Sequence, residues 1–194
     1  MKLGWRLALV VVLQTAALVY MIGARQWTLA TGTPVVLETV PIDPRSLFSG
    51  DYVRLGYRIS RLDLSEIAGE RNFRNHDVVY VTLRPGTPTW YPVSVCHDFP
   101  VVPQGDVAIR GEVTGITNGA WNPAARRWEE GSASVLSVRY GIESYFVPEG
   151  EGRELENPGR DAPVSVRVAV DHAGRAGIQA ILVDGVVRYE ERLF

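Results

Sequence analysis

Residues 50–57 read GDYVRLGY, and this stretch alternates apolar and polar side chains in the way that predicts a half-buried strand. Successive side chains of an extended chain point to opposite faces. We expect a strand over 52–59, with Arg54 and Arg58 on the face turned to solvent or to a binding partner. The opposite, core-facing side would carry Val53, Leu55, Tyr57 and Ile59.

Similar short apolar runs follow along the chain, most of them bounded by Gly, Pro, Asn or Asp. The dipeptide Asp184-Gly185 between two apolar runs predicts a two-residue hairpin, and Asn118-Gly119 is interpreted as the end of a strand. Beyond the N-terminal segment, helix is expected only as short turns over 43–50, 62–70 and 149–156. The predicted strands cover 34–40, 52–59, 78–83, 90–96, 107–114, 133–140, 164–170, 177–183 and 186–189. The fold class is therefore mainly β, all-β or β-rich α+β, as a barrel-like or sandwich-like domain behind one N-terminal transmembrane helix.

The N-terminal run 7–23 reads LALVVVLQTAALVYMIG and contains no charged residue. Its length is near the lower limit for crossing a bilayer as a helix, and Trp5 and Trp27 lie where interfacial aromatic side chains would extend it. A cleaved signal peptide is the alternative, but no small-residue cleavage site follows the run. We expect an uncleaved signal anchor over 1–25 and one β-rich domain over 26–194.

The charges that flank the apolar run predict its orientation. Lys2, Arg6 and the terminal amine outweigh Arg25, which places the N-terminus inside and the domain outside. We therefore expect the domain to be extracytoplasmic.

Composition excludes some classes of function. The net charge is −2, and nucleic-acid binding is not expected because it requires clustered positive charge. One cysteine excludes an internal disulfide. A metal site built from 96–98 with His76 or His172 lacks a recognised ligand spacing, and a half-buried strand beside an exposed histidine is the favoured interpretation. No cofactor is expected.

Two segments carry the candidate binding residues. The first is GDYVRLGY, and the second, 139–152, reads RYGIESYFVPEGEG. The glutamates of the second segment lack the spacing of a calcium-binding loop, so a solvated acidic turn is favoured over a cation site. We expect Asp51 or Tyr57 to lie against 139–145, forming a structural network or a binding site. The candidate residues are Asp51, Tyr52, Arg54, Tyr57, Arg139, Glu143, Tyr145 and Glu149.

The first segment resembles the motif that names the GDYXXLXY family, through Gly50-Asp51-Tyr52, Leu55 and Tyr57. The preceding DPRSLFSG and the second segment are also similar to that family, and the likeness extends over most of the chain. The resemblance implies a membrane-anchored bacterial protein with an extracytoplasmic domain of unknown function, often encoded beside polytopic membrane proteins. It implies no catalytic residue.

Three functions remain open from the sequence. The leading hypothesis is a binding module for a membrane or envelope partner, with a polytopic membrane protein as one such partner. A second is an enzyme like signal peptidases, which RSLFSGDYV faintly resembles; the nucleophile position is Ile42, however, and the one lysine is Lys2, so no Ser–Lys dyad exists. A third is a small-ligand site in a barrel mouth lined by Tyr52, Trp90 and Tyr145.

Overall fold

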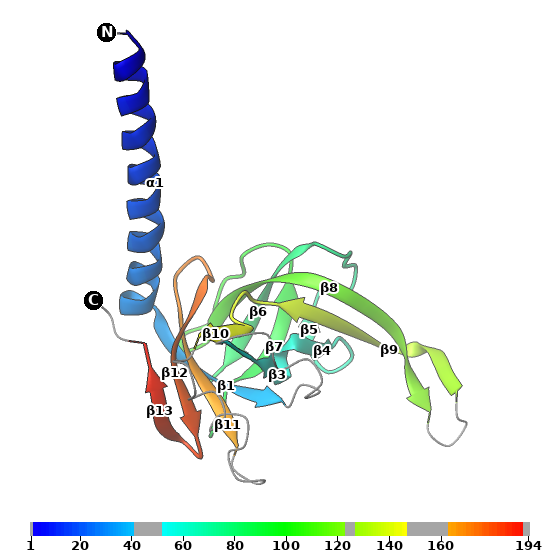
Figure 1. The fold of residues 1–194 in the computed structure, drawn as a ribbon. Helices are drawn as coiled ribbons and strands as arrows, with labels where there is room; N and C mark the ends of the chain where they lie inside the picture. Colours follow the sequence, from blue (N-terminus) through cyan, green and yellow to red (C-terminus); the bar gives the residue numbers. More distant parts are fainter. Residues whose placement is uncertain (1, 41–51, 123–126, 147–162, 192–194) are drawn as a thin grey trace.

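A long N-terminal helix projects from a β-rich domain (Figure 1). The structure is a computed structural model that describes residues 2–40, 52–122, 127–146 and 163–191. The helix, α1 (Lys2–Thr31), confirms the predicted N-terminal apolar helix and continues past its expected end. Its segment Gly4–Thr31 is long and apolar enough to cross a membrane, and no part of its most apolar window is buried.

One sheet of the described chain continues directly from the helix. Its strand order is β13-β12-β11-β1-β3, and its central pair joins β1 to β11 antiparallel, with Val35 opposite Val168 and Leu37 opposite Val166. The strands are β1 (Thr33–Val40), β3 (Gly56–Tyr57), β11 (Val164–Val170), β12 (Ala176–Val183) and β13 (Val186–Glu190).

The other large sheet within these ranges has the order β4-β9-β8-β6-β7-β5, and a two-stranded ladder pairs β10 with β2. The longest strands of this second large sheet, β8 and β9, form the arm at the right of Figure 1. The remaining strands are β2 (Tyr52–Arg54), β4 (Arg61–Asp63), β5 (Ala68–Gly69), β6 (Val78–Arg84), β7 (Tyr91–Cys96), β8 (Val107–Asn122), β9 (Arg127–Arg139) and β10 (Ser144–Phe146).

Both large sheets contribute to one hydrophobic core, as a sandwich-like β domain requires. Val35 of β1 and Val168 of β11 come from the first sheet, and Val81 of β6 and Leu136 of β9 come from the second. All four side chains are completely buried. The mainly β fold with one N-terminal apolar helix is therefore confirmed.

The GDYVRLGY stretch has the predicted faces but is not one strand. Leu55 is 6% exposed and Tyr57 is 1% exposed, whereas Arg54 and Arg58 lie at the surface. After Tyr57 the chain enters a 3-10 turn, Arg58–Ser60, so the strand predicted to reach residue 59 ends earlier. Leu55 separates β2 from β3, and these two strands pair with β10 and β1. The stretch therefore joins two sets of strands.

Three local predictions have different outcomes. The Asp184-Gly185 hairpin is confirmed: both residues have positive φ, 51° and 73°, as a tight two-residue turn between strands requires. The helical turn expected over 62–70 is wrong: 61–63 and 68–69 form β4 and β5, which pair with β9 and β7, and 64–67 form a non-helical turn between them. Asn118-Gly119 does not end a strand, since β8 continues through a register shift to Asn122. The turns expected over 43–50 and 149–156 lie outside the described residues.

The last turns of α1 pack against the first sheet rather than ending clear of it. Leu29 is buried, and the Thr28 hydroxyl donates a hydrogen bond of 3.0 Å to the buried carboxylate of Asp171. The Gln179 amide of β12 donates to the Leu29 carbonyl at 2.8 Å, and Arg25 donates to the Ala176 carbonyl at 3.0 Å. The helix is therefore docked on the domain through its own side chains and backbone.

Replacing Thr28 by Val tests this docking. The substitution conserves volume but removes a buried donor to a charged acceptor, so we expect a loss of about 1–3 kcal/mol in the free energy of unfolding. Urea unfolding of the full chain in detergent micelles measures the loss. Thr31→Val is the matched control, because the Thr31 hydroxyl bonds only to the Trp27 carbonyl of its own helix, at an exposed position. Equal effects of the two variants would contradict the docking role.

Candidate functional site

The two candidate segments meet along β2 and β10. Arg54 lies opposite Ser144 and Val53 opposite Tyr145 in antiparallel register, and the Leu55 N–H donates to the Glu143 carbonyl at 2.9 Å. The predicted contact between the first segment and 139–145 is therefore confirmed. It is made by Tyr57; Asp51 lies outside the described residues.

Two buried tyrosines link these two parts of the chain, and each donates a hydrogen bond to a backbone carbonyl of the other part. The Tyr57 hydroxyl donates to the Ile142 carbonyl at 2.7 Å, and the Tyr140 hydroxyl donates to the Ile59 carbonyl at 2.7 Å. Burial, and next the negative charge of Glu143, raise the pKa of both phenols above the usual range. Both hydroxyls therefore stay protonated at neutral pH and serve as donors.

Glu143 holds the turn between β9 and β10. Its carboxylate accepts the Tyr140 N–H at 2.6 Å, in a hydrogen bond that spans the turn. The acceptor is thus occupied by backbone, and the hydroxyls of Tyr57 and Tyr140 are occupied as well. These contacts support the structural interpretation of the meeting segments over the binding interpretation.

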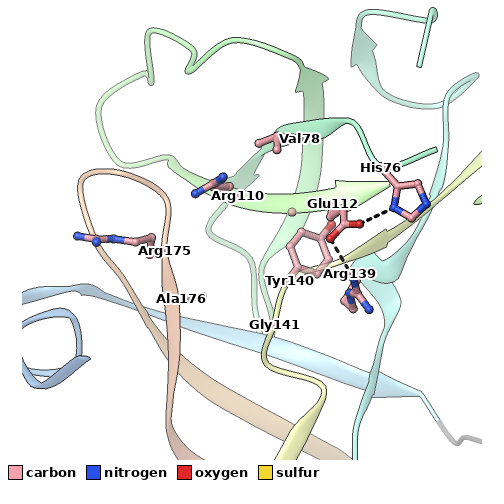
Figure 2. Close-up of a pocket in the computed structure, with 10 residues that line it drawn as sticks. His76, Val78, Arg110, Glu112, Arg139, Tyr140, Gly141, Arg175 and Ala176 are labelled. Carbon is pink, nitrogen blue, oxygen red and sulfur yellow. Dashed lines mark hydrogen bonds and ion pairs between the residues drawn. The ribbon is translucent and has the colours of Figure 1, made fainter. Parts of the chain in front are cut away.

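A pocket opens on the other side of Tyr140, between the start of β8, the end of β9 and the β11–β12 turn. Its volume is about 440 Å³. Figure 2 shows Arg110 and Arg175 on one side, and His76, Glu112 and Arg139 on the other, with Tyr140 between them. The lining residues are His76, Val78, Arg110, Gly111, Glu112, Arg139, Tyr140, Gly141, Arg175 and Ala176.

The pocket carries more positive than negative charge. Glu112 pairs with His76 Nδ1 at 2.8 Å and with the Arg139 guanidinium at 2.9 Å. These hydrogen bonds, the one from His76 first, lower the pKa of the Glu112 carboxyl, so it stays ionised. Arg175 pairs with Asp171 at 2.8 Å, whereas Arg110 has no ion pair within the described ranges. The arrangement is chemically suited to an anionic ligand.

A family model described as "GDYXXLXY protein" matches residues 14–181. The chain belongs to the GDYXXLXY family. Comparison with curated proteins and comparison with solved structures give no match.

The motif residues that the structure describes do not line the pocket: Leu55 and Tyr57 are core residues. The motif's Asp51 lies outside the described part. Among the candidates whose side chains are described, Arg139 alone lines the pocket. Arg54 is exposed on β2, and Tyr145 packs against the core, where burial and then Glu191 raise the pKa of its phenol. Glu149 lies outside the described residues, as does the side chain of Tyr52.

Sequence reasoning missed Arg110, Arg175 and His76 as pocket residues. Each stands in a segment without a motif, and only the pairing of strands brings the three together. The Arg110 N–H donates to the Gly174 carbonyl at 2.8 Å, which places the β11–β12 turn beside β8. No local signal in the sequence indicates that contact.

A second polar cluster, remote from the GDYXXLXY motif in sequence, surrounds His97. Its ring bonds to Glu70 through Nδ1 and to Asp77 through Nε2, the latter at 3.1 Å, and it stacks on Phe73. The expected exposed histidine beside Cys96 is instead an ion-pair centre. Across the described ranges, no group of three or more His, Cys, Asp and Glu side chains is placed to hold a metal ion.

Replacing Tyr57 by Phe tests the contribution of the hydrogen bond that the Tyr57 hydroxyl donates. The buried Ile142 carbonyl would lose its donor, so we expect a loss of about 1–2 kcal/mol in the free energy of unfolding. Tyr80→Phe is the matched control, because the Tyr80 hydroxyl makes no hydrogen bond within the described ranges, and its effect should stay within about 0.5 kcal/mol. Urea unfolding in micelles compares them. If Tyr57→Phe lowers the free energy of unfolding no more than Tyr80→Phe does, the Tyr57 hydrogen bond contributes nothing to stability.

The His97 cluster predicts a pH dependence of stability. Hydrogen bonds that the ring donates to Glu70 and then to Asp77 raise the pKa of His97, and the bonds that Glu70 accepts from His97 lower the pKa of the Glu70 carboxyl. The Asp77 carboxyl pKa is also lowered, by the Arg74 N–H first and then by His97. The raised histidine pKa stabilises the fold below the histidine's unfolded value, and this contribution is lost as pH rises through the folded value. The lowered carboxyl pKa values contribute above the unfolded carboxyl values and are lost in acid.

The cluster should therefore stabilise the domain most from about pH 5 to about pH 6.5 and least at alkaline pH. We expect the thermal unfolding midpoint to fall from about pH 6 to about pH 8, and His97→Gln to flatten that fall. His172→Gln, a change at an exposed histidine, is the control and should leave the slope unchanged. A His97→Gln slope equal to that of the control would contradict the role of the cluster.

Proposed function

We propose that this GDYXXLXY protein is a single-pass membrane protein whose β-rich domain is a binding module for a membrane or envelope partner. The observation that carries the proposal is the docking of α1 on the domain. A helix of membrane-spanning length runs with no linker into β1, and its last turns bond to Asp171, Gln179 and Ala176. The domain is thereby presented to the membrane surface in one orientation.

The orientation proposed for the span follows from its flanking charges. Lys2 and Arg6 precede the apolar run and Arg25 follows it, so the positive-inside rule places the N-terminus inside and the domain on the outer side. In a bacterial inner membrane this side is periplasmic. A polytopic membrane protein, which spans the same bilayer, is the partner best placed to meet the fixed face of the domain.

The pocket supports binding rather than chemistry. Among the described residues that line it there is no Ser, Thr, Cys or Lys, and the one carboxylate among them, that of Glu112, is held by His76 and Arg139. A small-ligand site is the second candidate function, favoured by a pocket volume within the range of about 300–1,000 Å³ typical of such sites. That ligand site would be the arginine-lined pocket, not the aromatic mouth expected from the sequence.

Site-specific photo-crosslinking in native membranes tests the proposal. A photoreactive residue at Val78, which is partly exposed and lines the pocket, should give a discrete crosslinked product that stays in the carbonate-washed membrane fraction. Val186 is the matched control, because it is an exposed valine that follows the β12–β13 turn, at the end of the domain remote from α1 (Figure 1). No product at Val78, or equal products at both positions, would contradict a partner at the pocket face. Release of the chain by carbonate would contradict the anchor.

A further inference from the structure

A second cavity adjoins the pocket on the side of the helix. Its volume is about 220 Å³, and it is lined by Ala24, Arg25, Thr28, Arg175 and Ala176. Arg175 and Ala176 line both cavities, so the two lie next to each other between the end of the apolar helix and the start of β8. We call this pair of adjacent cavities the arginine groove, after Arg25, Arg110, Arg139 and Arg175.

The charge of the groove is opposite to that of the domain around it. Without Lys2, Arg6 and Arg25, the 20 basic residues of the chain fall to 17 against 22 acidic ones, yet four arginines gather here. Arg25 and Arg110 have no ion pair in the described part of the chain. The guanidinium of Arg175 is half exposed, whereas the carboxylate that neutralises it, Asp171, is 2% exposed and faces inward. The groove therefore presents positive charge to its ligand.

The groove also has a defined position along the helix. Arg25 follows the uncharged run 7–23 almost directly, and the docking of α1 on Asp171 and Ala176 holds the groove beside that end of the run. In Figure 1 the β11–β12 turn, which carries Arg175, lies on the side of the domain from which α1 projects. If α1 spans a bilayer, the groove lies at the depth of the headgroups.

We propose that the arginine groove binds the phosphate of an anionic phospholipid headgroup from the membrane that α1 spans. Guanidinium groups donate paired hydrogen bonds to phosphate oxygens, and they bind phosphate through geometry as well as charge. Arg110 and Arg175 supply such donors from one side of the pocket (Figure 2), and Arg25 supplies them from the helix. The inference rests on the proposed membrane anchoring and adds a ligand class to it.

Native mass spectrometry of the full chain, purified in a neutral detergent, tests the groove with phosphatidylglycerol as the probe and phosphatidylcholine as the neutral lipid. We expect the wild-type chain to retain phosphatidylglycerol in preference to phosphatidylcholine. Arg110→Gln should lower that retention about tenfold, the effect of losing one charge-assisted contact. Arg110 forms no ion pair in the described ranges, so this variant should fold normally. Arg61→Gln is the matched control, because Arg61 is exposed on β4, outside the groove; it should retain phosphatidylglycerol like the wild type.

A competition arm with inorganic phosphate and glycerol phosphate distinguishes the source of the ligand. Displacement of phosphatidylglycerol only by other anionic lipid supports the headgroup assignment. Displacement by equally low concentrations of inorganic phosphate would overturn that assignment in favour of a free anion. Equal retention by Arg110→Gln and Arg61→Gln, or no preference for phosphatidylglycerol in the wild type, would overturn the groove as a site. Carbonate extraction tests the membrane anchor separately. A chain that stays in the membrane fraction but shows no preference for phosphatidylglycerol refutes the headgroup inference and leaves the anchor standing.

Discussion

The arrangement of helix, turn and groove depends on one buried carboxylate, that of Asp171. It accepts hydrogen bonds from the Ala173 and Arg175 N–H groups at 2.9 Å, from the Arg175 guanidinium at 2.8 Å and from the Thr28 hydroxyl at 3.0 Å. Burial is the largest single influence and acts to raise its pKa, yet the four hydrogen bonds together lower it. One ionised group thus shapes the β11–β12 turn, orients Arg175 and fastens α1 to the first sheet.

The motif that characterises the family has a structural role in this chain. Leu55 and Tyr57 fill the core. The hydroxyls of Tyr57 and Tyr140 donate to the Ile142 and Ile59 carbonyls, and these two bonds hold together the junction of two sets of strands. A tyrosine suits this position because its ring fills apolar space while its hydroxyl satisfies a carbonyl that phenylalanine would leave unpaired. The surface suited to ligand binding lies on the far side of Tyr140, so Leu55 and Tyr57 pack behind the pocket and do not line it.

The sequence predicts the β architecture well and the site poorly, for a physical reason. Alternation and turn chemistry act over a few residues, so the burial of Leu55 and the Asp184-Gly185 hairpin could be read from the chain itself. The predicted contact of Tyr57 with the second segment was correct because buried hydroxyls need acceptors. Arg110 and Arg175 meet only through the pairing of distant strands. The ends of 62–70 form short strands instead of helix because neighbouring strands provide partners that local propensity does not anticipate.

The junction between α1 and β1 is too short and too crowded to act as a flexible linker. Gly32 separates them, and a side-chain carbon there would lie 2.6 Å from the Thr28 carbonyl oxygen and 3.0 Å from Ala169. Most linkers between a span and its domain let the two reorient independently. If α1 spans a bilayer as proposed, rotation or tilt of the helix therefore turns the whole β domain with it. A neighbouring transmembrane helix that rotates α1 would therefore rotate every surface of the domain through the same angle.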